Sequence, residues 1–141
     1  MVKILNKPHF FFFSLIPISL IIGLILNNQT LDFAYYGGAI SFNYFSIFSI
    51  SAVFFALIGL NYFSLILLKK QPKKWLTLFH IILQILSFVI LTYYAFAIKN
   101  TETEPQKELL TLMFFIGFIL FLISVLIHLL SFFISLLIKT E

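Results

Sequence analysis

Two histidines are the residues of this 141-residue chain whose type and position could carry chemistry. His80 and His128 each stand inside a long run that holds no charged side chain. Neutral imidazoles can ligate haem iron, and ionisable side chains within a membrane commonly belong to functional sites. One interpretation of the sequence is therefore a small membrane haem or redox protein that uses His80 and His128.

The same histidines belong to two rows of polar residues that recur at helical spacing. The steps between members are three, four and three residues in one row and four, three and four in the other, which places each row on one face of a helix. The rows are Thr77, His80, Gln84 and Ser87, and Ser124, His128, Ser131 and Ser135. Because polar groups are costly in lipid, we expect the rows to face each other inside a bundle and to hydrogen-bond between helices.

The depth of the histidines in the membrane is compatible with both interpretations. At 1.5 Å per residue, His80 would lie about 8 Å and His128 about 12 Å from the same membrane face. A site that uses both rings is geometrically possible, and so are hydrogen bonds from each ring to Gln or Ser. A weaker polar row follows residues 42–68 and includes Ser46, Ile50, Leu57 and Asn61.

The composition excludes most classes of soluble protein. The chain is 62% hydrophobic and 10% charged, whereas soluble domains carry roughly 25% charged residues. It holds no cysteine, which excludes a catalytic thiol and thiolate metal sites. Its acidic residues lie outside the long apolar runs, and no glycine-rich phosphate loop appears. We therefore expect no enzyme, no metal site and no nucleic-acid partner, and a lipid bilayer as the surroundings.

Four charge-free runs predict the elements that position the polar rows. A helix needs about 20 apolar residues to cross a hydrocarbon core of about 30 Å, and the runs do not alternate as barrel strands do. The predicted spans are about 9–27, 42–68, 75–98 and 109–136. We predict an all-α, antiparallel four-helix bundle, a single transmembrane domain over 1–141. The connection 27–41 is expected to be an interfacial loop with a turn at Gly37 and Gly38.

The lysines predict the orientation. With four spans, seven lysines share the side that holds both termini, and two lie on the other side. Four of the seven form the connection between the second and third spans: Lys69, Lys70, Lys73 and Lys74. Positive residues favour the cytoplasmic side, so both termini are expected there, in a bacterial cytoplasmic membrane or alternatively the mitochondrial inner membrane. The lysine connection is interpreted as a topology signal, with an anionic-lipid or partner site as the alternative.

One stretch of the chain resembles a known family. Residues 28–32 end in Leu31 and Asp32, Phe45 follows, and residues 52–59 end in Gly59. This order resembles the C-terminal four transmembrane helices of haem–copper cytochrome c oxidase subunit I, in which a Leu-Asp pair precedes a helix that opens with His-Phe-His. His80, in the sequence Leu-Phe-His-Ile, falls where the family's next helix opens with a histidine.

The chain departs from that family at the metal ligands. Tyr44 and Ser46 stand where the family has its two haem-ligating histidines. The family's copper ligands lie on earlier helices that have no counterpart in these 141 residues. The resemblance therefore implies a degenerate form without the haem and copper ligands.

These observations predict a non-catalytic polytopic membrane protein. Its partners would be other membrane subunits or further copies of itself, and it could be an accessory subunit of a respiratory, cytochrome oxidase-like complex. The alternatives are the haem or redox protein that uses His80 and His128, and a small oligomeric transporter or channel.

Overall fold

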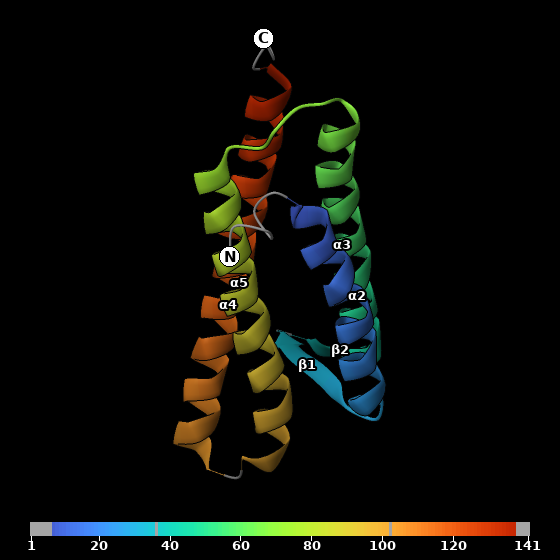
Figure 1. Ribbon diagram of the computed structural model, residues 1–141. Coiled ribbons are helices and arrows are strands. Elements are labelled where there is room, and N and C mark those ends of the chain that lie inside the picture. Colours follow the sequence, from blue (N-terminus) through green and yellow to red (C-terminus); the bar gives the residue numbers. More distant parts are fainter. Residues whose placement is uncertain (1–6, 36, 102, 138–141) are drawn as a thin grey trace.

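Four long helices dominate the computed structural model, which describes residues 7–35, 37–101 and 103–137 (Figure 1). The elements are α2 (Pro8–Ile25), β1 (Thr30–Tyr35), β2 (Gly38–Asn43), α3 (Tyr44–Leu67), α4 (Lys74–Ala97), the 3₁₀ turn η1 (Ile98–Asn100) and α5 (Glu104–Leu137). All four α-helices are long and apolar enough to cross a membrane. The predicted all-α four-helix architecture is thereby confirmed.

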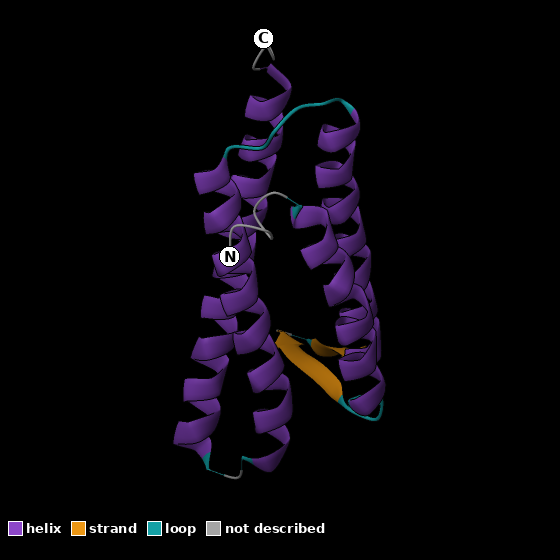
Figure 2. Ribbon diagram, viewed as in Figure 1, coloured by secondary structure: helices purple, strands orange, loops and turns teal. Residues whose placement is uncertain are grey.

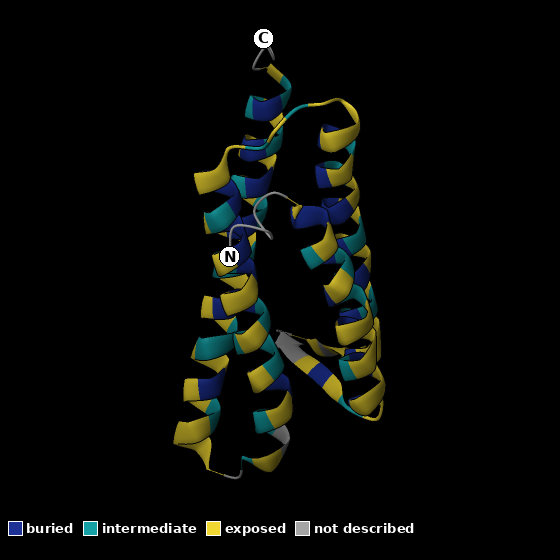
Figure 3. Ribbon diagram, viewed as in Figure 1, coloured by how far each residue is buried: buried dark blue, intermediate teal, exposed yellow. Residues whose placement is uncertain are grey.

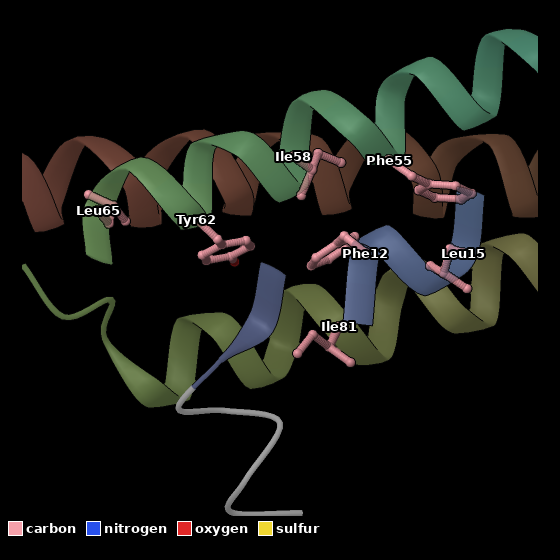
Figure 4. Packing of buried hydrophobic residues seen from close by; sticks show 7 residues of the cluster. All are labelled: Phe12, Leu15, Phe55, Ile58, Tyr62, Leu65 and Ile81. Carbon is pink, nitrogen blue, oxygen red and sulfur yellow. The ribbon is translucent and has the colours of Figure 1, made fainter. Parts of the chain in front are cut away.

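The helices pack as two antiparallel hairpins. Figure 1 shows α2 beside α3 and α4 beside α5, with the connection between α3 and α4 passing from one hairpin to the other. A cluster of buried residues lies between the hairpins (Figure 4). Its members come from α2, α3 and α4 and are Phe12, Leu15, Phe55, Ile58, Tyr62, Leu65 and Ile81. The hairpins therefore share one core instead of standing as separate units.

A short β-hairpin replaces the interfacial loop that was expected at residues 27–41. β1 and β2 pair antiparallel, from Thr30 opposite Asn43 to Tyr35 opposite Gly38 (Figure 2). Pairing gives the backbone groups partners near the membrane, where unpaired groups are costly. Gly37 adopts a φ of +103°, which glycine reaches without strain. The turn prediction was right, but the strands were missed, although Thr30 to Phe33 and Ile40 to Asn43 alternate between polar and apolar residues over four residues each.

Asn43 joins the β-hairpin to α3. Its side-chain oxygen accepts a hydrogen bond from the backbone N–H of Phe45 at 2.7 Å, which caps the helix. Its side-chain amide donates to the carbonyl of Asn27 at 2.6 Å. One side chain thus fixes both the start of α3 and its position beside the end of α2.

The distribution of side chains is inverted relative to a soluble protein. Several of the least exposed residues are polar, and large apolar residues are exposed on every helix. Figure 3 shows that exposed positions occur along all four helices. Ser19, Thr77 and His80 are fully buried, whereas Leu24 is 62% and Leu126 60% exposed. Apolar side chains at such exposure fit lipid as the solvent, and the fold is that of a polytopic membrane protein.

Candidate functional site

The two polar rows lie inside the bundle, on facing sides of α4 and α5. Every member of both rows is buried: Thr77, His80, Gln84, Ser87, Ser124, His128, Ser131 and Ser135. The Ser124 hydroxyl lies 3.0 Å from Gln84 Oε1 and 3.3 Å from the His80 carbonyl oxygen. The Ser87 hydroxyl donates to the Gly117 carbonyl at 2.8 Å. These contacts hold α4 and α5 together by hydrogen bonds.

His80 links α4 to the other hairpin. Its Nδ1 lies 2.9 Å from the hydroxyl of Tyr62 in α3. Its ring stacks on Phe12 of α2, with 4.8 Å between ring centroids and 16° between the planes. Tyr62 stacks on the same phenylalanine, at 5.6 Å and 15°. His80 is therefore packed and hydrogen-bonded by side chains from both helices of the first hairpin.

His128 makes the second polar link between the hairpins. Its Nε2 lies 3.2 Å from Nδ2 of Asn61 in α3. An amide nitrogen can only donate, so Nε2 is the acceptor and a neutral His128 carries its proton on Nδ1. The His128 and His80 rings lie side by side, with 4.8 Å between centroids and 33° between planes. The two imidazoles thus form the centre of one buried cluster.

Some polar atoms of this cluster lack a partner. Among the described residues, no hydrogen bond reaches His80 Nε2, His128 Nδ1, Thr77 Oγ1 or Ser131 Oγ. Thr77 and Ser131 both lie close to Tyr62. Polar atoms without partners are uncommon in the interior of a protein. The cluster therefore has hydrogen-bonding capacity beyond the bonds that its own side chains make.

The arrangement does not fit a haem held between the two histidines. Axial ligands bind iron from opposite faces of a flat macrocycle, and metal–nitrogen bonds of about 2 Å would put the facing nitrogens about 4 Å apart, with the ring centres farther still. Here the ring centroids are 4.8 Å apart, and Phe12 covers one face of His80. Across residues 7–35, 37–101 and 103–137, no group of three or more His, Cys, Asp or Glu could hold a metal ion.

Two members of the cluster were not identified from the sequence. Tyr62 and Phe12 complete the surroundings of His80, yet tyrosine is common at membrane interfaces and phenylalanine throughout membrane helices. Neither residue type signals a buried contact by itself. The weaker row on α3 also lies differently from the rows on α4 and α5, because Ile50 and Leu57 are exposed and only Asn61 reaches the cluster.

The four lysines of the predicted topology signal lie at one end of the bundle. Lys69, Lys70 and Lys73 lie in the connection between α3 and α4, and Lys74 begins α4. The end of α5 lies toward the same side, opposite the β-hairpin (Figure 1). The structure therefore separates the basic end of the molecule from the end that carries Asp32.

The fold and the buried cluster define a four-helix polytopic membrane protein with a hydrogen-bonded His–Tyr–Asn core. No protein-family model, curated protein or solved structure matches this chain. The positions that the oxidase resemblance assigns to haem ligands hold a buried Tyr44 and an exposed Ser46, at the start of α3. The resemblance to cytochrome oxidase subunit I stays a prediction from the sequence.

Proposed function

We propose that this chain is a non-catalytic membrane protein that works by lateral association, as an accessory subunit of a membrane complex. The oxidase resemblance makes respiratory complexes of the cytochrome oxidase kind the first candidates. We place it in a bacterial cytoplasmic membrane, with the mitochondrial inner membrane as the alternative, and the lysine distribution favours both termini on the cytoplasmic or matrix side.

The observation that carries the proposal is the exposure of α5. Only 17% of its most apolar stretch is buried within the chain, against 33% in each of the other helices. Its outward side chains include Phe115, Phe118 and Phe133. Large aromatic side chains supply much of the contact energy in protein interfaces. A helix that packs so little against its own chain and presents such residues is suited to contact another subunit.

The hydrogen bonds within the buried polar cluster support a non-catalytic role. Seven members of the cluster hydrogen-bond to one another or to nearby backbone: Asn61, Tyr62, His80, Gln84, Ser124, His128 and Ser135. The described carboxylates belong to β1 and to the start of α5, away from the cluster. His80 Nε2 and His128 Nδ1 have no partner among the described residues, but both rings are buried, so a substrate would have to enter the core to exchange protons with them.

Gentle solubilisation tests the association directly. Tagged protein would be extracted in a mild detergent and separated on a native gel, and its partners identified by mass spectrometry. We expect a complex that contains at least one different integral membrane protein in fixed ratio. A second copy with a different tag distinguishes self-association, and recovery of this chain alone or with copies of itself would contradict the accessory-subunit proposal.

Single-cysteine crosslinking tests whether the outward face of α5 contacts the partner. Because the chain has no cysteine, each introduced thiol is unique. Leu126→Cys on α5 and Leu24→Cys on α2 replace the same residue type at 60% and 62% exposure. We expect a maleimide photo-crosslinker on residue 126 to capture the partner and the same reagent on residue 24 to capture much less. Equal capture would show that α5 is not the contact face.

The absorption spectrum of the purified protein tests the alternative that the chain binds haem. A bis-histidine haem gives a Soret band in the purified protein that is lost in His80→Ala and His128→Ala. Since the ring geometry does not accommodate a porphyrin, we expect no such band. A Soret band that depends on both histidines would replace the present proposal with the redox alternative.

A further inference from the structure

Four lysines line one hollow at the basic end of the molecule. The hollow has a volume of about 570 Å³ and is formed by the start of α2 and the connection between α3 and α4. Its lining consists of Lys7, Ile66, Lys69, Lys70, Gln71, Pro72 and Lys74. Side chains from two separate segments of the chain thus bring positive charge to one place.

Among residues 7–35, 37–101 and 103–137, no acidic side chain forms an ion pair with Lys7, Lys69 or Lys74. The ion pair found there joins Lys107 to Glu104, at the start of α5. Lys70 Nζ donates to the backbone carbonyl of Leu136, so it is held by a neutral group as well as lining the hollow. Like charges so close together repel, and a bound anion would relieve that repulsion.

The backbone at Lys69 is the second observation. Lys69 has a φ of +56°, the left-handed conformation that glycine adopts with least strain. It occupies the first position beyond the cap of α3, where the Lys69 N–H bonds to Ile66 O at 2.9 Å and the Lys70 N–H to Leu65 O at 2.8 Å. This pair of bonds is the Schellman motif, whose left-handed residue is usually glycine. A lysine at this strained position is accounted for if its side chain has a task in the hollow.

The start of α4 adds to the positive potential. Lys74 is its first residue, and the preceding Lys73 makes no side-chain cap. The free N–H groups of a helix N-terminus carry partial positive charge and favour anions, phosphates in particular. Helix and lysines therefore act in the same direction.

We propose that this lysine hollow binds the phosphate of an anionic phospholipid at the membrane surface. The hollow includes Ile66, and beside it Leu67, Leu68 and Trp75 are all more than half exposed. Tryptophan at this level is typical of the headgroup region. A lipid whose phosphate meets the lysines would lay its acyl chains along these apolar side chains, which a free phosphate ion could not use.

Removing one lysine charge inside the hollow and one outside it distinguishes a specific lipid site from general attraction between the protein and anionic lipid. Lys69→Asn removes a charge from the hollow with a residue that tolerates the left-handed conformation. Lys73→Asn removes the same charge from the same connection, at a residue with ordinary backbone angles that does not line the hollow. Lys69→Gly keeps the turn and removes the side chain, so any loss of binding is not a loss of folding.

The measurement is phosphatidylglycerol binding to the detergent-purified full chain by native mass spectrometry, with phosphatidylcholine as the neutral lipid. We expect wild type and Lys73→Asn to prefer phosphatidylglycerol, and Lys69→Asn and Lys69→Gly to bind it about fivefold more weakly. Without anionic lipid, Lys69→Gly should unfold at a temperature no lower than wild type. Equal losses in Lys69→Asn and Lys73→Asn, or no preference for phosphatidylglycerol, would overturn the site.

Inorganic phosphate distinguishes the two sources of the anion. Thermal unfolding would be followed with phosphatidylglycerol or with inorganic phosphate added at matched phosphate concentration. We expect the lipid alone to raise the unfolding temperature of wild type, and to raise that of Lys69→Asn less. Equal stabilisation by inorganic phosphate would assign the hollow to a soluble phosphate instead of a lipid.

Discussion

The hydroxyl of Tyr62 lies 2.9 Å from Nδ1 of His80, and this hydrogen bond joins the two helical hairpins. Tyr62 belongs to α3 and His80 to α4, 18 residues apart across the lysine connection. Phe12 stacks on both rings and closes the contact from α2. The pair therefore fixes how one hairpin sits on the other, in a region where most contacts are apolar and allow sliding.

Tyr62→Phe should lower the stability of the protein while retaining its fold. The substitution keeps the ring stacked on Phe12 and leaves His80 Nδ1 without its partner. Hydrogen bonds between membrane helices contribute about 0.6 kcal/mol on average and about 1.7 at most, so we expect a loss of about 1 kcal/mol. Unfolding in detergent, followed by circular dichroism, measures it. Tyr93→Phe, on an exposed side chain, is the control, and equal stability of both variants would contradict the role of the bond.

The contact between Asn61 and His128 should be measurable as a coupling energy. The two atoms are 3.2 Å apart, and their residues are 67 positions apart in the sequence. A double-mutant cycle of Asn61→Ala and His128→Ala isolates their interaction from the effect of each truncation. We expect a favourable coupling of about 0.6 kcal/mol, the usual value in membranes. Strict additivity would mean that the amide and the ring do not interact.

Gly117→Ala should loosen the packing of α5 on α4. An added methyl carbon would lie 2.9 Å from Ile90 Cγ2 and 3.1 Å from Leu91 Cδ2. Ile90 is β-branched and stiff, so it cannot swing away freely. Overpacking of this kind costs about 1–3 kcal/mol, which is only partly offset by the gain of about 1 kcal/mol that alanine brings over glycine in a helix. The unfolding free energy in detergent is the test. Unchanged stability would show that the two helices do not approach each other as closely as the structure has them.

Gly59→Ala is compared with Gly117→Ala because it places the same added carbon against a different neighbour. Here the added carbon would meet the ring edge of Phe13, at 2.5 Å from Cε1. The nominal overlap is larger, but Phe13 is only partly buried and its ring can rotate. Alanine also favours a helix over glycine by about 1 kcal/mol. We therefore expect Gly59→Ala to be close to neutral, and a loss greater than that of Gly117→Ala would contradict this argument.

Thiol labelling tests the orientation that the lysines predict. Gln71→Cys lies in the lysine connection and Thr103→Cys precedes α5 at the opposite end. In intact bacterial cells, a membrane-impermeant maleimide should label residue 103 and reach residue 71 only after the membrane is opened. The absence of native cysteine makes the unmodified chain the blank. The reverse labelling pattern would invert the topology.

The sequence alone determined the class of protein and the faces of two helices. Apolar runs of membrane length leave few folds open, because lipid offers no partner for an unpaired backbone. The spacing of His80 and Gln84, or of Ser124 and His128, identifies a helix face because the period of a helix is fixed. Such local regularities are properties of one segment, and they can be recognised without knowing what the segment packs against.

Only the tertiary structure decided which side chains contact one another. Tyr62 reaches His80, and Asn61 reaches His128, only because two hairpins pack at one register, which no single segment encodes. The same holds for Lys7, which lines one hollow with Lys69 and Lys74 although it lies far from them in the sequence. In a membrane the polar groups must find each other across helices, so the spacing predicts that they are buried, and packing chooses the atoms that they contact.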